Sequence, residues 1–521
     1  MKIEADRALT TPIYYCNARP HLGHTYTTIL ADFIVRLEKL RGKRTWFITG
    51  TDEHGEKMAQ TAAKSGKTPQ EHCDEYSKYF RDAWDALRLS PDCFYRTSDP
   101  KHYELVQSAL QRLYDKGEIY FAEYEGLYCL GCERYRKESE LTPEGLCPDH
   151  LTRPEIRKEP NYFFKMSKYQ ERLVDHYKKN TDVIQPEHFR NEVLSMLTEP
   201  LEDLNISRSK ERLTWGIELP FDKNFVTYVW FDALLSYLGG QGYTGTESID
   251  EIPLWKETSH TLAKDILKTH AIYWPTMLWA LDLPAPKKLI VHGYWLVKGH
   301  KMSKSLGNVV EPLNFAAQFG VEAMRYYLLS DMSFGVDASM TIESFVAKVN
   351  SDLANGLGNL TSRTLTLAHK NFEGKLPPRG KLEDVDQDLL KCFEGLTDRV
   401  YAEFDQYRLH IGIKLIMDAV RECDRYINLT APWKLAKEGN LERLGTVLNV
   451  ASEALYKLSI LLDPILPEST QKLRTALGVT SITPVTLKDY DHKLTVGSPL
   501  GEVPRLFARL EVPKDLEEAA T

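Results

Sequence analysis

The chain has 521 residues, of which 42% are hydrophobic and 27% charged, and its formal net charge is -8 at pH 7. This length is too great for one hydrophobic core, so we expect roughly three or four domains. The negative charge excludes a uniformly basic nucleic-acid-binding surface, although a local basic groove remains compatible with it. No apolar run is long enough to span a bilayer and the first residues lack an apolar signal core, so we expect a cytoplasmic protein without membrane association.

The N-terminal residues predict a parallel β–α–β unit. Residues 9–16 are expected to form a buried strand, residues 21–40 have apolar side chains at helical spacing, and residues 45–49 predict the next strand. Parallel sheets bind ligands beyond the carboxyl ends of their strands. We therefore expect Tyr15, the helix start at His21, and Asp52 to converge on one crevice.

Two short motifs far apart in the chain are suited to hold negative oxygens. The first is His21-Leu22-Gly23-His24 at a predicted helix start, and the second is Lys301-Met302-Ser303-Lys304-Ser305. A helix start offers free N–H groups and the positive end of a dipole, and lysines act as point charges on phosphates. Together and in this order, the motifs indicate nucleophilic attack on the α-phosphate of ATP with loss of pyrophosphate. The alternative for the histidines is an ordinary polar helix start.

Residues 116–225 interrupt the α/β pattern and carry a cysteine cluster. Cys129, Cys132, Cys147 and His150 make a Cys3His set of two close pairs, which suits one tetrahedral zinc ion. Four protein ligands leave no open position, so the expected ion is structural. The alternative is unpaired thiols beside a surface histidine. The other five cysteines are scattered singly and are expected to be reduced thiols.

The second half of the chain changes from α/β to helical character. A buried strand is predicted at residues 289–293, and from residue 344 to about residue 473 the pattern is helical, with an apolar stripe at Leu353, Leu357 and Leu360. We expect a Rossmann-like α/β domain with a parallel sheet, a zinc-knuckle insertion and an all-α helix bundle. The expected segments are 1–115, 116–225, 226–295, 296–350 (the lysine loop and a linker) and 351–521.

Further motifs resemble those of class I aminoacyl-tRNA synthetases, and among them the methionyl-tRNA synthetases. They are the stretches 10–15 (TTPIYY), 50–55 (GTDEHG), 228–233 (YVWFDA) and 264–267 (KDIL), and the resemblance covers nearly the whole chain. It implies catalytic roles for His21, His24, Lys301 and Lys304. It implies ATP binding by these residues together with Gly23, Glu218, Asp265, His292, Gly293 and Ser303, although a surface salt bridge is the alternative for Glu218.

The resemblance also implies a methionine pocket. Asp52 would anchor the substrate ammonium, and the other positions are Ile13, Tyr15, Trp230, Ala233, Tyr237, Ile266 and His270. A long, polarisable thioether suits an aromatic cage with a weak polar contact, whereas core packing is the alternative for each aromatic taken singly. Ala263 and Thr269 depart from the family pattern, which usually has Gly and a large aromatic residue there.

Three residues of the helical part are implied to read the CAU anticodon. Asn359 and Arg363 lie four apart and therefore share a helix face, and Trp433 follows Ala431-Pro432. An aromatic plane, an amide and a guanidinium suit unstacked bases. The alternative for Trp433 is packing between helices.

The activity implied by the resemblance has two steps: activation of L-methionine by ATP with Mg²⁺ to methionyl-adenylate, then transfer to the 3'-terminal adenosine of tRNA(Met), including the initiator tRNA. The resemblance implies one structural Zn²⁺, and the chain ends soon after the bundle, so we expect a monomer. Two rivals are another nucleotidylyltransferase with an HxGH motif and a nonenzymatic zinc-knuckle RNA-binding protein. Asn359, Arg363 and Trp433 argue against the first rival, and His21, His24 and Lys304 argue against the second.

Overall fold

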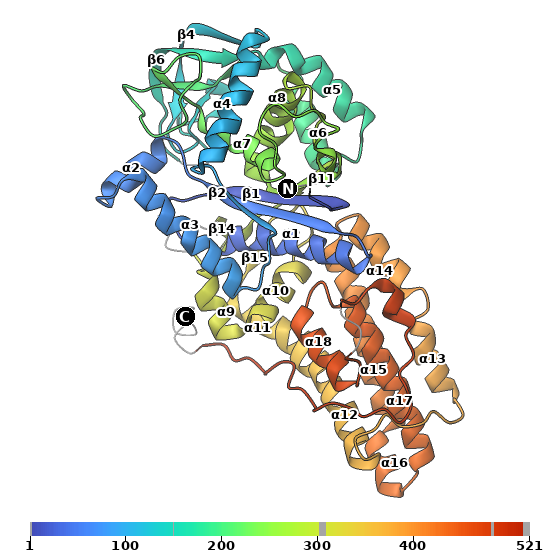
Figure 1. The fold of residues 1–521 in the computed structure, drawn as a ribbon. Helices are drawn as coiled ribbons and strands as arrows, with labels where there is room; N and C mark the ends of the chain where they lie inside the picture. Colours follow the sequence, from blue (N-terminus) through green and yellow to red (C-terminus); the bar gives the residue numbers. More distant parts are fainter. Residues whose placement is uncertain (1–2, 149–150, 298, 302–308, 481–483, 514–521) are drawn as a thin grey trace. The chain divides into compact units, whose positions relative to one another are not determined.

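The computed structural model describes residues 3–148, 151–297, 299–301, 309–480 and 484–513. Its contacts divide the chain into two compact units (Figure 1). The first unit comprises Met1–Ala31 and Arg44–His292, and the second comprises Asp32–Lys43 and Gly293–Thr521. The five segments expected from the sequence are finer than this division, and their boundaries stay predictions.

A six-stranded sheet forms the centre of the first unit, in the order β3-β2-β1-β11-β12-β7. All five strand pairings are parallel, as expected for an α/β fold. The strands are β1 (Arg7–Tyr15), β2 (Thr45–Asp52), β3 (Cys93–Arg96), β7 (Ile184–Gln185), β11 (Thr258–Ala263) and β12 (Lys288–His292). The register pairs Tyr15 with Asp52 and Ala263 with His292, so the last residues of four strands lie along one edge.

Helices with clear start signals connect these strands. A capping box at Thr68 starts α3 (Pro69–Ala86), and the Asp99 side chain caps α4 (Pro100–Asp115). The other helical elements are α1 (Leu22–Leu40), which runs from the first unit into the second, α2 (Glu56–Lys64), α7 (Val229–Gly239), η3 (Pro253–Glu257), η4 (Lys264–Ile266), η5 (Thr269–Tyr273) and α8 (Trp274–Ala280). Helix α7 is buried along nearly its whole length and contacts β1 and β3, so it packs against the central sheet.

The insertion adds a four-stranded antiparallel sheet in the order β5-β4-β6-β8. Its strands are β4 (Ile119–Cys129), β5 (Arg134–Arg136), β6 (Glu155–Phe164) and β8 (Leu204–Asn205). The same region contains η1 (Glu138–Glu140), η2 (Met166–Tyr169), α5 (Gln170–Lys179), α6 (Glu187–Met196), β9 (Ser207–Ser209) and β10 (Phe225–Thr227). The last residue of β4 is Cys129, so the long β4–β6 ladder supports the cysteine cluster from one side.

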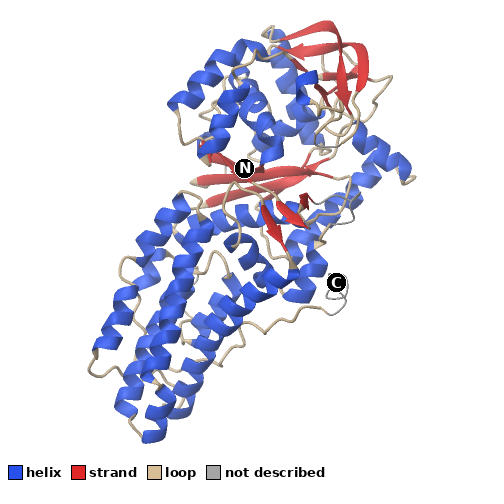
Figure 2. Ribbon diagram, turned by 180° about the vertical axis from the view of Figure 1, so that it is seen from behind, coloured by secondary structure: helices blue, strands red, loops and turns tan. Residues whose placement is uncertain are grey.

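Helices dominate the second unit, as expected (Figure 2). The predicted leucine stripe, Leu353, Leu357 and Leu360, is buried, and long helices α15 and α17 pack against each other. The helices are α9 (Pro312–Phe319), α10 (Val321–Ser330), α11 (Ile342–Val349), the π-helix η7 (Asn350–Gly358), α12 (Asn359–Asn371), α13 (Asp384–Cys392), α14 (Leu396–Asp405), α15 (Leu409–Thr430), α16 (Pro432–Glu438), α17 (Leu441–Leu461), α18 (Pro467–Ala476) and η8 (Leu487–Asp491). The unit also contains a small sheet of β13 (Trp295–Val297), β14 (His300–Lys301) and β15 (Ala338–Met340), in the order β14-β13-β15.

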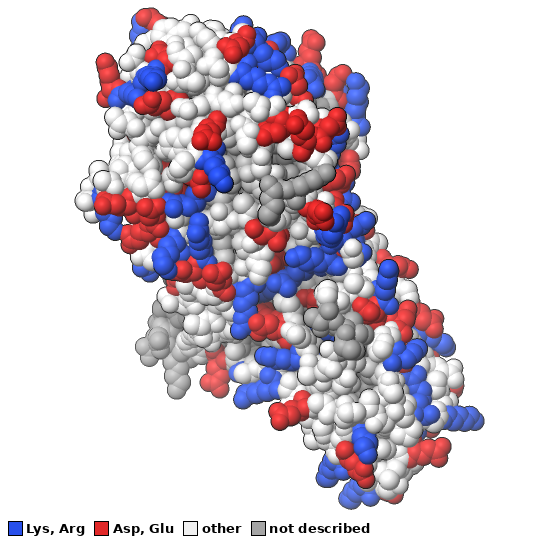
Figure 3. Space-filling model, in the orientation of Figure 1, with Lys and Arg blue, Asp and Glu red and all other residues white. Residues whose placement is uncertain are grey.

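Charges of both signs are mixed on the visible surface (Figure 3), which agrees with the prediction from the net charge that no uniformly basic coat is present. Within the described ranges, no helix combines the length and apolar character needed to cross a membrane.

Candidate active site

Four strands of the first unit end along one edge of the sheet. Tyr15 ends β1, Asp52 ends β2, Ala263 ends β11 and His292 ends β12. Because the strands are parallel, all four are carboxyl ends, which is where open α/β sheets bind their ligands. The strand register therefore brings these four strand ends to one edge, and a ligand crevice there stays a prediction.

The two histidines before and within the first turn of α1 are held by main-chain N–H groups. The Gly23 amide donates to His21 Nδ1 at 3.0 Å, and the His21 amide donates to His24 Nδ1 at 3.3 Å. The two rings stack with their centroids 3.8 Å apart. Since each Nδ1 accepts, each neutral ring carries its hydrogen on Nε2. The motif thus makes both imidazoles Nε2–H donors beside a helix N-terminus, which is suited to phosphate oxygens.

Asp52 is almost completely buried at the end of β2. The residue is 2% exposed, and its Oδ1 has no hydrogen-bond partner among the described residues. Burial raises the pKa of Asp52 well above its ordinary value, and the negative charges of Asp232 and Glu133 raise it further. A buried carboxylate in this state is expected to gain from a cationic ligand.

Tyr237 and His270 form a fixed polar pair in the candidate methionine pocket. His270 Nδ1 lies 2.9 Å from the carbonyl oxygen of Ile266, which can only accept, so the ring hydrogen is on Nδ1. His270 Nε2 then accepts from the Tyr237 hydroxyl at 2.8 Å. Burial lowers the pKa of His270 to about 4, so its ring is neutral near pH 7. A neutral, preorganised pair suits an uncharged thioether.

The remaining candidate pocket residues come from three parts of the first unit. Ile13 and Tyr15 lie on β1, Trp230 and Ala233 on α7, and Ile266 on η4. Trp230 and His270 meet edge to face with their centroids 6.5 Å apart, and Ala233 is buried. Of the two departures, Ala263 ends β11 and Thr269 is a buried residue of η5. These placements leave the methionine-binding roles as predictions.

The candidate ATP-binding residues are in several different environments. His292 is buried, and its Nε2 lies 2.8 Å from the hydroxyl of Thr27 on α1. Glu218 makes an ion pair with Lys210, which is the kind of contact named above as the alternative for Glu218. Asp265 is an exposed residue of η4. A Cβ on Gly293 would come within 2.5 Å of the Val336 main chain, so only glycine fits there.

Ser303 and Lys304 of the second motif lie outside the described residues, as does the side chain of Lys301, whose backbone belongs to β14. Their phosphate-binding roles stay predictions.

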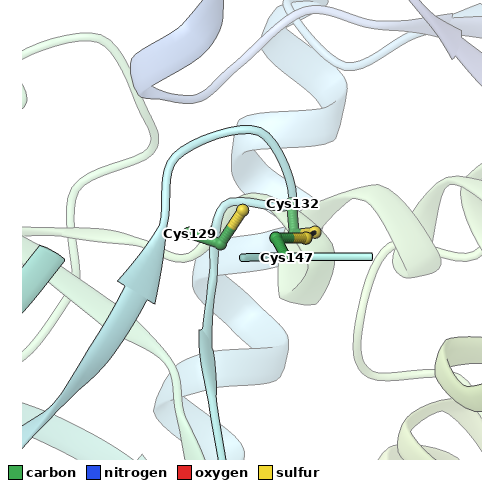
Figure 4. Close-up of side chains that lie close together, drawn as sticks. All are labelled: Cys129, Cys132 and Cys147. Atoms are coloured by element: carbon green, nitrogen blue, oxygen red, sulfur yellow. Dashed lines mark hydrogen bonds between the residues drawn. The ribbon is translucent and has the colours of Figure 1, made fainter. Parts of the chain in front are cut away.

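Three of the four candidate zinc ligands come together (Figure 4). The sulfurs of Cys129, Cys132 and Cys147 lie within 4.8 Å of one another, and Cys132 Sγ is 3.5 Å from Cys147 Sγ. Zinc–sulfur bonds of about 2.3 Å place tetrahedral sulfurs about 3.8 Å apart, so the cluster fits this ion. Arg136 donates to Cys132 Sγ at 2.7 Å, as expected for a thiolate ligand with a supporting donor. The fourth candidate, His150, lies outside the described residues.

The second unit brings Arg363 and Trp433 into contact. The Arg363 guanidinium carbon lies 4.8 Å from the centroid of the Trp433 ring, and Arg363 also donates to Asn428 Oδ1 at 3.1 Å. Trp433 is 42% exposed, so it is not a core residue. Asn359 is exposed one helical turn before Arg363 on α12. Sequence reasoning missed Asn428, whose polar character at the exposed end of α15 gave no motif.

Sequence reasoning also missed a buried cluster beside Asp52. It consists of Asp232 on α7, His54 after β2 and His102 on α4. Asp232 and His54 were part of quoted motifs, but nothing in the sequence indicated that His102 would join them.

A Rossmann-like parallel sheet with a histidine pair after its first strand, in one chain with a helical unit that exposes an Arg–Trp pair, is the arrangement that the resemblance to class I aminoacyl-tRNA synthetases implies. Comparisons with known families agree with this class. The family described as "tRNA synthetases class I (M)" matches residues 7–153 and 150–365, and "Anticodon-binding domain of tRNA ligase" matches residues 386–492.

Individual relatives narrow the class. The chain is 41% identical to the methionine–tRNA ligase of Clostridium acetobutylicum over 98% of its own length and 79% of that protein. It is 45% identical to the Deinococcus radiodurans enzyme of the same name, over 90% of this chain and 70% of that protein. A solved structure of Mycobacterium tuberculosis methionyl-tRNA synthetase with methionyl-adenylate is 37% identical, with a TM-score of 0.92 and coverage of 96% and 99% of the two chains. The chain belongs to the methionyl-tRNA synthetase family.

Proposed function

We propose that this protein joins L-methionine to tRNA(Met) in two steps. In the first, a carboxylate oxygen of methionine attacks the α-phosphorus of ATP, and the bond to the bridging oxygen breaks to give methionyl-adenylate and pyrophosphate. In the second, a hydroxyl of the 3'-terminal adenosine attacks the activated carbonyl, its proton leaves, and AMP departs. The observation that carries this proposal is the carboxyl edge of the sheet, where Asp52 ends β2 and the His21–His24 pair follows the neighbouring strand β1, in a chain of this family.

The methionine pocket supplies charge for one end of the substrate and a neutral surface for the other. We propose that Asp52 binds the ammonium, because this buried carboxylate ends a strand and its Oδ1 has no hydrogen-bond partner within the described part of the chain. Tyr237 and His270 present a neutral hydrogen-bonded pair to the side chain. The methionine carboxylate is already a nucleophile, so the first step needs positioning rather than a general base.

The phosphates are the part of ATP on which charge develops in the first step. We propose that His21 and His24 donate from Nε2 to phosphate oxygens, which stabilises the transition state without a change in protonation. Gly23 lets the main chain come close. Mg²⁺ enters with ATP and neutralises part of the phosphate charge. We propose that Lys304, assisted by Lys301, acts on the leaving pyrophosphate and that Glu218 and Asp265 bind the adenosine hydroxyls. Ser303, His292 and Gly293 are proposed as further ATP-binding residues.

The cysteine cluster is proposed to hold one structural Zn²⁺ through Cys129, Cys132, Cys147 and His150. The support is the close approach of the three sulfurs and the Arg136 donor. The ion supplies no catalytic step, since four protein ligands leave no open position. It would fix the turn between β4 and β5.

The helical unit is proposed to read the CAU anticodon of tRNA(Met), both elongator and initiator. Trp433 has an exposed ring for stacking, Arg363 offers donors beside it, and Asn359 is exposed one helical turn before Arg363. We further propose that the protein acts in the cytoplasm as a monomer, which light scattering in solution would check.

Methionine-dependent exchange of pyrophosphate into ATP tests the first step. Methionine should stimulate exchange well above the other standard amino acids. A nucleotidylyltransferase for another small molecule would give no amino-acid-dependent exchange, and equal stimulation by leucine or isoleucine would reject the pocket assignment.

A further inference from the structure

The start of helix α2 is capped by a side chain from the insertion. The first N–H groups of a helix have no partners inside the helix, and Gly55 at this start has no side chain with which to bind them. Glu133, which follows Cys132 in the insertion, supplies an acceptor, because its Oε1 accepts from the Lys57 amide at 2.5 Å. Lys57 is the second residue of α2, a position that an ordinary N-cap side chain binds. Glu133 therefore acts as the N-cap of a helix that lies 76 residues away in the chain.

Contacts on both sides fix the direction of the Glu133 carboxylate. Glu133 is 2% exposed and has a φ of 52°, in the left-handed region that residues other than glycine rarely adopt. The buried Arg208 donates to the Glu133 carbonyl oxygen at 3.3 Å, and the Glu133 amide donates to the Leu130 carbonyl oxygen at 3.3 Å. A Cβ on Gly55 would overlap the Glu133 carboxylate, so this carboxylate lies directly against the Gly55 main chain. A strained backbone of this kind persists where its surroundings determine it.

The capped helix start packs beside the candidate methionine pocket. Met58 of α2 is buried in one cluster with Cys16, and Tyr15, the last residue of β1, packs against this cluster. The Lys57 ammonium lies 5.8 Å from the centroid of the Tyr15 ring, which is within the range of a cation–π contact. The first turn of α2 thus contacts the strand end that carries Tyr15.

The residue next to the candidate ammonium anchor is held by other contacts. Glu53, which follows Asp52, accepts from Arg96 Nε at 2.7 Å and from Arg96 Nη2 at 2.9 Å. The Glu53 amide donates to the Thr97 hydroxyl at 2.9 Å. Loss of the Glu133 cap is therefore expected to loosen the start of α2 and the Tyr15 side of the pocket, and to leave Asp52 in place.

We propose that Glu133 is a positioning residue for methionine, because it caps α2 from the insertion and so holds the first turn of that helix against the Tyr15 end of β1. Glu133 acts through Lys57 and Met58 and does not touch the substrate. Loss of the cap lowers the fraction of molecules in which this turn is ordered, and the apparent affinity for methionine falls with that fraction. The inference rests on the proposed function, because it takes Tyr15 as a residue of the methionine pocket.

The kinetics of pyrophosphate exchange test this role in the whole chain. For Glu133→Ala we expect KM for methionine to rise roughly tenfold, as the loss of one helix cap predicts, while kcat and KM for ATP change by less than about twofold. Glu133→Gln keeps an oxygen that accepts from the Lys57 amide, and it should recover most of the affinity for methionine. Glu138→Ala is the matched control, because Glu138 is an exposed glutamate of the same insertion. An unchanged KM for methionine in Glu133→Ala, or an equal loss for ATP, would overturn the inference.

Hydrogen exchange of the main-chain amides separates this role from a general loss of stability. Peptides that cover α2 should exchange faster in Glu133→Ala and at the unmodified rate in Glu133→Gln, whereas peptides from the distant α17 should not change. Unchanged exchange of α2 in Glu133→Ala, or faster exchange of α17 as well, would reject the capping role.

Two further outcomes are decided by the same measurements. If Glu133→Ala does not fold, Glu133→Asp replaces it, since its side chain is one methylene shorter and should lose the hydrogen bond to Lys57, with the same rise in KM for methionine. A normal KM in that variant would reject the inference alone. If the unmodified protein shows no methionine-dependent exchange of pyrophosphate, the proposed function fails, and the inference fails with it.

Discussion

Replacing Trp433 by alanine separates the two activities of the protein most clearly. Trp433 belongs to the second unit, is 42% exposed and contacts the Arg363 guanidinium. A base stacked on an aromatic side chain contributes about 1–3 kcal/mol. At about 1.4 kcal/mol per tenfold, this loss lowers kcat/KM for tRNA charging by roughly five- to 150-fold. Methionine-dependent pyrophosphate exchange requires no tRNA and should stay near normal.

The exposure of Trp433 also predicts how much Trp433→Ala lowers the free energy of unfolding. An exposed tryptophan with one cation–π contact should contribute about 1 kcal/mol to folding. Trp295 of the same unit is 2% exposed, and its replacement by alanine should cost about 3–5 kcal/mol. Trp433→Phe keeps an aromatic plane and should recover most of the charging. If Trp433→Ala unfolds as readily as Trp295→Ala, or loses exchange and charging in parallel, Trp433 is a packing residue and the reasoning is wrong.

Three further substitutions test other parts of the molecule. Lys304→Ala should remove about 3 kcal/mol of transition-state stabilisation, which lowers the exchange rate roughly a hundredfold with little change in methionine affinity. Replacing the exposed Lys391 by alanine is the control and should have no effect. A near-normal exchange rate for Lys304→Ala would refute the role of Lys304. Elemental analysis should find one zinc per chain, lost in Cys132→Ser and kept in Cys392→Ser, and a protein that is fully folded and metal-free would contradict the knuckle. Asp386→Asn should lower the free energy of unfolding by about 3–5 kcal/mol, because buried Asp386 accepts from both Arg443 and Tyr426, and the exposed Asp388→Asn should not. Burial acts to raise the pKa of Asp386, but Arg443 and Tyr426 hold that pKa below its ordinary value. The stability that Asp386 contributes is therefore present at neutral pH and is lost in acid as pH falls through the lowered pKa. Denaturant titrations across pH would contradict this if the unmodified protein and Asp386→Asn lost stability equally in acid.

The parts of the fold that depend on local pattern were predictable. Apolar spacing predicted the first helix to residue 40, where α1 ends, and close cysteine pairs predicted a cluster that the structure forms. The first strand, expected at residues 9–16, is observed at Arg7–Tyr15, and the second extends from the expected 45–49 to Asp52. Both differences arise because pairing with neighbouring strands, which no local pattern encodes, decides where a strand ends.

Contacts between distant elements were not predictable. His102 meets Asp232 only because α4 and α7 pack together, and each residue alone resembles an ordinary core or surface position. The π-helical turn Asn350–Gly358 was likewise hidden, since its leucine spacing also fits an α-helix. The Lys210–Glu218 ion pair is a contact that the sequence offered only as a general alternative, and the nucleoside contact of Glu218 stays a prediction.

The most direct test of the central claim is attachment of amino acids to a tRNA(Met) transcript by the purified protein. The account predicts that methionine is attached to the 3' end of the transcript with the CAU anticodon, that leucine and isoleucine are not, and that changing the anticodon sharply lowers charging. Failure to charge this transcript with methionine, or equal charging with leucine, would contradict the account.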